Sequence, residues 1–149
     1  MSKGNRVIQP LGRVAKAAAA LEAVLSVGAL GGGLMLMIAP RGEIIPLPLS
    51  ALAGSPFDTY FGPGLILFGV LGLGPLVAAL LIRLRHPLAP IAAFAVGAAL
   101  LIWVAVEVAI IGYSSEPPLQ AIYAVVGVAI VLVAARWLLE AGLPRLTPS

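Results

Sequence analysis

Long runs of apolar residues, interrupted by proline, glycine or charge, dominate the pattern along this chain. A helix needs about 20 mostly apolar residues to cross the hydrocarbon core of a bilayer. The runs that are long enough cover residues 17–38, 64–82, 89–111 and 119–139. Prolines stand close before or after these runs, where a missing backbone N–H costs little. The pattern therefore predicts four transmembrane helices.

The lengths of the connections predict how these helices are arranged. A short basic turn joins the second and third segments, and residues 112–118 join the third and fourth, so these helices should lie antiparallel as neighbours. Residues 40–63 form a longer outer connection between the first two segments. We predict an all-α integral membrane four-helix bundle with up-down topology, forming a single domain. Because the outer connection is apolar, we expect it to lie on the membrane surface or to close the outer mouth of the bundle.

The composition supports a membrane protein and excludes several kinds of reactive or metal-binding site. The chain is 61% hydrophobic and 10% charged, whereas an ordinary globular domain carries about 25% charge. It contains no cysteine and a single histidine, which excludes thiolate chemistry and a histidine-paired haem or metal site within one chain. We predict no cofactor and no catalytic residue, and expect the protein not to be an enzyme.

The positive charges mark one side of the predicted membrane domain. Of the nine Lys and Arg residues, only Arg41 falls on the outer side of the predicted topology. Lys and Arg accumulate in short cytoplasmic flanks, so we expect both termini in the cytoplasm. The excess of Lys and Arg over Asp and Glu thus reflects membrane orientation and does not indicate nucleic-acid binding.

Glu107 is a candidate functional residue because a carboxylate inside a membrane segment is costly and usually faces a partner or a water-filled cavity. Tyr123 should lie at its level on the next helix, with Gln120 one turn above, and Trp103 shares its helix face. One interpretation is a structural Glu107–Tyr123 hydrogen bond. The alternative is a proton or cation site.

Glu22 is the second acidic residue within an apolar run. If the membrane crossing begins at Leu21, this carboxylate sits at the inner interface and pairs with a basic side chain. The candidate partners are Lys16, Arg83, Arg85 and Arg136. The alternative is a functional role inside the membrane. In layout the chain resembles the small multidrug-resistance transporters, which use an early carboxylate for proton-coupled export, although their flanking pattern and weak charge bias are absent.

Small residues recur at every fourth position in two of the predicted helices. Gly28 and Gly32 form one such pair, and Ala89, Ala93 and Gly97 form a second stripe. Such stripes let helix backbones approach closely in lipid. We expect contacts within the bundle, with self-association or docking on a larger membrane complex as the alternative.

Several short sequence motifs between residues 47 and 123 resemble those of a group of small bacterial four-helix membrane proteins of unassigned activity. They are the proline-rich stretch at 48–57, Pro-Gly-Leu-Ile-Leu at 63–67, Ile-Trp at 102–103, and Ile-Gly at 111–112 before a proline-led last helix. The resemblance implies the fold and a bacterial cytoplasmic membrane.

Three functional hypotheses follow from these observations. The first is a non-enzymatic accessory or scaffold subunit that packs against lipid or another membrane protein, because chemical groups are few. The second is a small transporter or channel that uses Glu107 and Glu22. The third is a binder of lipid or another hydrophobic ligand under residues 47–61.

Overall fold

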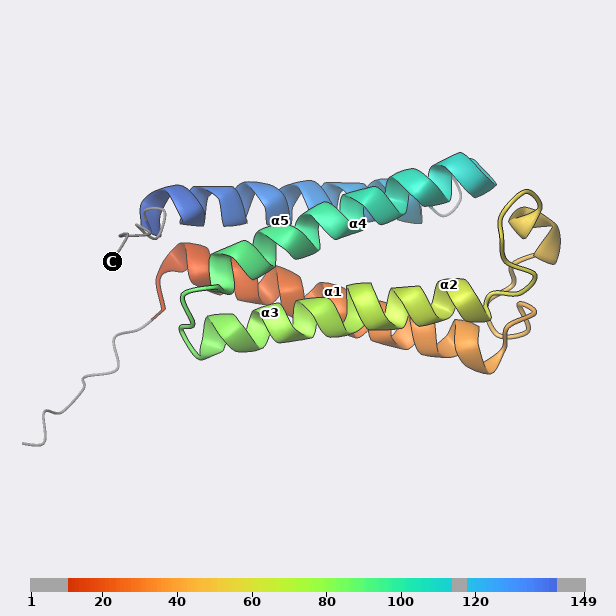
Figure 1. Cartoon of the computed structure of the whole chain (residues 1–149), viewed down its shortest axis with the longest axis horizontal. Coiled ribbons are helices and arrows are strands. Elements are labelled where there is room, and N and C mark those ends of the chain that lie inside the picture. Colours follow the sequence, from red (N-terminus) through yellow and green to blue (C-terminus); the bar gives the residue numbers. More distant parts are fainter. Residues whose placement is uncertain (1–10, 114–117, 142–149) are drawn as a thin grey trace, which may run out of the picture.

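The computed structural model describes residues 11–113 and 118–141, and within them every regular element is a helix (Figure 1). Four helices are long and apolar enough to cross a membrane: Arg13–Ile38, Phe61–Arg83, Ala89–Ile111 and Leu119–Ala141. The predicted all-α bundle of four membrane-spanning helices is therefore confirmed. The first helix begins before the predicted residue 17, because the alanine-rich stretch that precedes Leu21 is a good helix former.

The helices pack as two pairs. Helix α1 (Arg13–Ile38) lies along the second span, which consists of α2 (Phe61–Ile66), η2 (Leu67–Leu73) and α3 (Gly74–Arg83). Helices α4 (Ala89–Ile111) and α5 (Leu119–Ala141) form the second pair. Contacts of α3 with α4 and of α1 with α5 join the pairs, which Figure 1 shows as two layers.

Glycines allow the close approach within each pair. A Cβ on Gly33 of α1 would lie 2.7 Å from the backbone nitrogen of Phe68. A Cβ on Gly97 of α4 would lie 2.9 Å from the Ile130 side chain. Ala89 and Ala93 are also fully buried. The stripe that contains Gly97 thus packs inside the bundle, as expected.

The second span is not a regular α-helix. Its middle segment, η2, is a π-helix, and α3 follows with Pro75 in its first turn. In an α-helix the Pro75 ring would clash with the carbonyl four residues earlier, and a wider π turn relieves that contact. Ser26 Oγ of α1 donates a hydrogen bond of 2.8 Å to the Gly72 carbonyl. A neighbouring helix thus satisfies backbone at the irregular point.

The connection between α1 and α2 folds over one end of the bundle. It contains the short 3-10 helix η1 (Leu49–Leu52), which also contacts α4. Tyr60 is buried, and its hydroxyl donates a 2.8 Å hydrogen bond to the Pro48 carbonyl. Leu36 and Leu52 pack beside it. The apolar connection covers this end of the bundle, in agreement with one of the two predicted placements.

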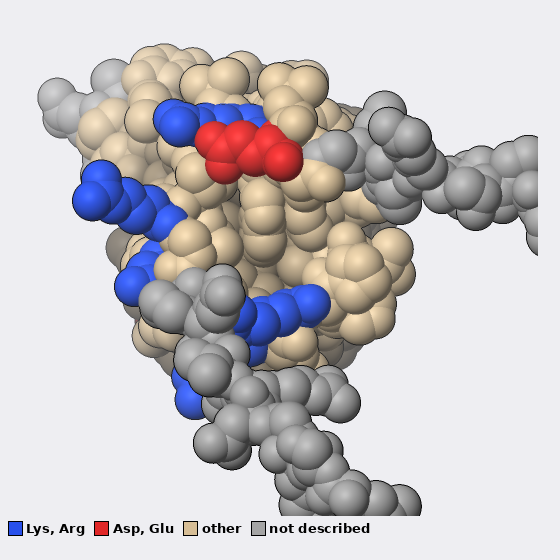
Figure 2. All heavy atoms as spheres, turned by 90° about the vertical axis from the view of Figure 1, so that its left-hand side faces the viewer, with Lys and Arg blue, Asp and Glu red and all other residues tan. Residues whose placement is uncertain are grey.

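Positive charge gathers at the opposite end, where α1 begins and α5 ends (Figure 2). We call this the basic end; its described basic residues are Arg13, Lys16, Arg83, Arg85 and Arg136. One of them, Arg136, pairs with Glu140 at 2.8 Å, and both side chains are largely exposed. Such a surface pair adds little to stability.

Candidate functional site

The least ordinary side chain in the bundle is Glu22. It lies on the buried face of α1, between Ala18 and Leu25, with 0% of its surface exposed. Neither carboxylate oxygen has a hydrogen-bond partner among the described residues. Burial of an ionised carboxylate without a partner is very costly. The site therefore requires compensation by a proton or a cation.

The Ser26–Gly72 hydrogen bond shows how far along the bundle the Glu22 carboxyl lies. Gly72 lies at the centre of the span Phe61–Arg83, so Ser26 is level with the middle of the bundle. Glu22 is one turn earlier in α1, about 6 Å toward the basic end. Since the hydrocarbon core is about 30 Å thick, Glu22 lies well within it.

This depth corrects one prediction. We expected Glu22 at the inner interface, paired with a basic side chain. The predicted pairing is wrong, because the carboxyl is fully buried and has no partner among residues 11–113 and 118–141. The α1 helix starts earlier than the hydropathy pattern indicates, at Arg13, so Glu22 lies more than two turns from the start of the helix.

Buried alanines form much of the core between Glu22 and the basic end. Ala15 and Ala18 lie on the same face of α1 as Glu22 but closer to the basic end, and both are buried. Their cluster includes Ala89 of α4 and Ile82 of α3. Ala15 also lines a pocket that opens at the basic end, about 10 Å along α1 from Glu22. On α1, the buried Ala18 thus lies between the carboxyl and this pocket.

Glu107 has a different environment. It is half-buried and lies about 6 Å before the end of α4. The side chains of Gln120 and Trp103 lie within hydrogen-bonding reach of its carboxyl. Gln120 Nε2 also donates a 3.0 Å hydrogen bond to the Gly112 carbonyl. These contacts hold Glu107 in a polar cluster that joins α4 to α5.

The predicted Glu107–Tyr123 hydrogen bond is wrong. Gln120 takes the place expected for Tyr123. The Tyr123 hydroxyl instead lies against α1, where a Cβ on Gly28 would come within 3.6 Å of it. The helix α5 is rotated so that Gln120 is buried and turned toward α4. Gln120 and Trp103 were both predicted near Glu107, and the structure brings them there.

The sequence prediction missed Ser26, the π-helical segment η2 and the pocket at the basic end. A signal for η2 was present, because Gly69, Gly72 and Gly74-Pro75 interrupt the second apolar run near its middle. Gly- and Pro-interrupted segments near the midplane mark binding sites in several transporter folds. No such signal existed for the pocket, which combines residues from all four spans.

The chain matches no protein-family model, no curated protein and no solved structure. The resemblance to small bacterial four-helix membrane proteins stays a prediction. The features of the chain that bear on its function are the two carboxyl groups, the irregular second span and the different ends of the bundle.

Proposed function

We propose that the protein is a small transporter of the bacterial cytoplasmic membrane in which the Glu22 carboxyl binds and releases a proton. One observation carries the proposal: this carboxyl is fully buried within the membrane-spanning bundle, and both oxygens lack a partner among the described residues. Intramembrane carboxyl groups of this kind mark ion and proton pathways.

A proton fits this site better than a metal ion does. Hard cations take about six or more oxygen ligands, whereas no group of three acidic, histidine or cysteine side chains exists within the described residues. The nearby Ser26 hydroxyl donates its hydrogen bond to the Gly72 carbonyl, so it does not stabilise an ionised Glu22. A single proton on Glu22 removes its charge without any further ligand.

The two ends of the bundle suggest the direction of access. The basic end should face the cytoplasm, since Lys and Arg are enriched on that side. The connection around Tyr60 covers the other end, while a pocket opens at the basic end and reaches Ala15. We infer that the proton on Glu22 exchanges with the cytoplasm past the alanine-lined core, with η2 as the element that rearranges.

An accessory subunit is the second candidate, and Gly31 favours it. A Cβ added to Gly31 would meet nothing within 4 Å, so this part of α1 is open to a partner helix. Glycine on an outward-facing part of a helix lets the backbone of another helix approach closely in lipid. Replacement of Gly31 by Leu should then release a copurifying partner or dissociate a homo-oligomer, which size-exclusion chromatography in mild detergent would detect.

The transporter proposal can be tested without a known substrate. Purified protein is reconstituted into liposomes on a solid-supported membrane, and the solution pH is changed stepwise. The wild type should give a transient current as Glu22 exchanges its proton, and Glu22→Gln should reduce the displaced charge at least about tenfold. Glu107→Gln is the matched control and should keep the current. Equal currents from wild type and Glu22→Gln would refute the proposal.

A further inference from the structure

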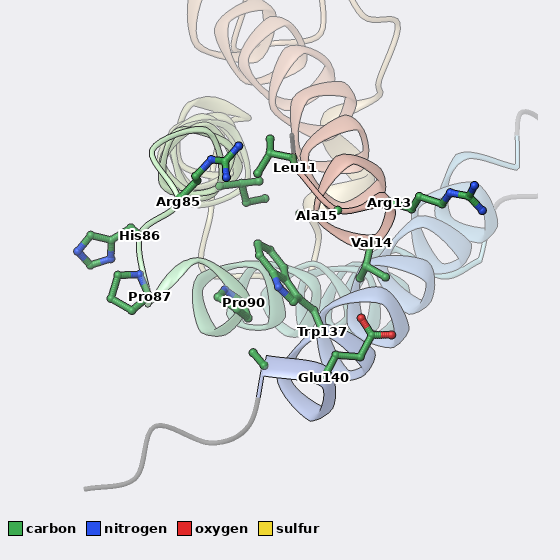
Figure 3. A pocket seen from close by; sticks show the side chains of 13 residues that line it. Leu11, Arg13, Val14, Ala15, Arg85, His86, Pro87, Pro90, Trp137 and Glu140 are labelled. Carbon is green, nitrogen blue, oxygen red and sulfur yellow. The ribbon is translucent and has the colours of Figure 1, made fainter. Parts of the chain in front are cut away.

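The pocket at the basic end has a volume in the range of small-molecule sites. Its volume is about 370 Å³, within the range of about 300–1,000 Å³ typical of ligand pockets. It lies between the start of α1, the α3–α4 turn, the start of α4 and the end of α5 (Figure 3). All four membrane spans therefore contribute to its walls.

Apolar side chains form most of these walls. The Trp137 indole projects from α5 into the space between α1 and α4 (Figure 3). Pro90 and Ile82, both buried, and Leu11 lie around it. A half-buried indole that lines a pocket offers a large flat surface to an aromatic ring or an acyl chain.

Arg85 contributes a positive charge to the pocket. Its side chain is directed toward the pocket beside Leu11, whereas the His86 ring is directed away and accepts a 3.2 Å hydrogen bond from the Leu88 N–H (Figure 3). Arg85 has no ion pair among the described residues, since Glu140 is bonded to Arg136. The guanidinium is therefore available to an anion from outside.

The backbone conformation at Arg85 indicates that the side chain at this position has a role. Its φ is 55°, in the left-handed region that favours glycine. The Arg85 N–H donates to the Ile82 carbonyl and the His86 N–H to the Leu81 carbonyl, at 3.0 and 2.9 Å. This is the Schellman end of α3, and its left-handed position is usually glycine. A strained non-glycine residue beside a pocket points to a role for its side chain.

We propose that this pocket binds an amphipathic anion, with an apolar or aromatic body against Trp137 and a carboxylate or phosphate on the Arg85 guanidinium. Arginine matches such groups with two parallel hydrogen bonds. The anion can come from the membrane as a lipid headgroup or from solution as an aromatic acid. Binding here does not depend on the proton at Glu22, so the two proposals can fail separately.

The test uses the fluorescence of Trp137. The Trp103→Phe variant leaves Trp137 as the single tryptophan, because the chain has two. It is placed in nanodiscs of zwitterionic lipid and titrated with dioctanoyl phosphatidylglycerol, as the lipid source, and separately with 2-naphthoate, as the soluble source. A saturable change in emission with either probe identifies the source.

Two arginine variants decide whether the pocket is responsible. Arg85→Gly relieves the left-handed backbone and should raise thermal stability, yet it should weaken binding at least about tenfold. Arg83→Gln removes the same charge from an exposed position outside the pocket and should change the affinity less than about twofold. If Trp103→Phe does not fold, the same comparison is made by thermal shift with Trp103 in place. Absence of saturable binding, or equal affinity in Arg85→Gly, would overturn the proposal.

Discussion

Glu22 and Glu107 are two carboxyl groups inside membrane-spanning helices, and the bundle treats them in opposite ways. Glu107 is half-buried near the end of α4, with Gln120 and Trp103 within hydrogen-bonding reach. Glu22 is completely buried near the middle of the bundle and has no partner among the described residues. A carboxylate with donors contributes to the fold, whereas one without donors costs stability. The difference agrees with a structural role for Glu107 and is the basis of the functional role that we propose for Glu22.

The largest effect should come from replacing each carboxyl by leucine, because the two substitutions should change stability in opposite directions. Glu22→Leu removes an unsatisfied buried group and should raise the free energy of unfolding by about 1–3 kcal/mol. Glu107→Leu deprives Gln120 and Trp103 of an acceptor and should lower it by about 1–2 kcal/mol. Unfolding by SDS in mixed micelles measures both values. A loss of stability in Glu22→Leu similar to that in Glu107→Leu would remove the distinction.

Pro75 tests whether the irregular second span serves the Glu22 site. Pro75→Ala restores a backbone N–H and removes the clash that a π turn relieves. We expect α-helical geometry to extend into residues 67–73, with a gain in stability of about 1 kcal/mol or more and a smaller transient current after a pH step. Stabilisation at the cost of activity is the usual result at strained functional positions. An unchanged current in a stabilised variant would show that η2 has no part in proton exchange.

Ser26 offers a smaller and more local test. Ser26→Ala removes the hydrogen bond to the Gly72 carbonyl and should cost about 0.6 kcal/mol, the average for such bonds between membrane helices. Because Ser26 lies one turn from Glu22, the kinetics of the transient current should also change. The control is Ser55→Ala in the outer connection, which should leave the current as it is. A change of equal size in both variants would exclude a specific role for Ser26.

The last prediction concerns the covered end, on which the proposed direction of access depends. Tyr60→Phe removes the hydrogen bond to the Pro48 carbonyl and should cost about 1 kcal/mol. Burial raises the pKa of Tyr60. Its contribution to stability is therefore complete below the unfolded value of about 10 and is lost as pH rises through the higher folded value. Proteolysis of the connection should accelerate in Tyr60→Phe at neutral pH, and in the wild type only at strongly alkaline pH.

The sequence predicted the spans well and the partners of the two carboxyl groups only in part. Apolar runs of sufficient length permit few alternatives, because lipid requires every backbone group to be paired within the segment. The environment of Glu22 depends on where α1 begins, and a run of alanines gives hydropathy little to distinguish interface from interior. The partner of Glu107 depends on the rotation of α5, which packing sets. Helix α4 is apolar around its whole circumference, so periodicity alone could not identify its buried face.

The charge state of Glu22 tests the central claim most directly. Attenuated total reflection infrared spectroscopy of the reconstituted protein at neutral pH separates the carbonyl stretch of a protonated carboxyl from the bands of carboxylates. We predict a protonated carboxyl band in the wild type and in Glu107→Gln, and its loss in Glu22→Gln. If the wild type showed no such band, or if the band persisted in Glu22→Gln, Glu22 would not hold the proton and the proposed mechanism would be wrong.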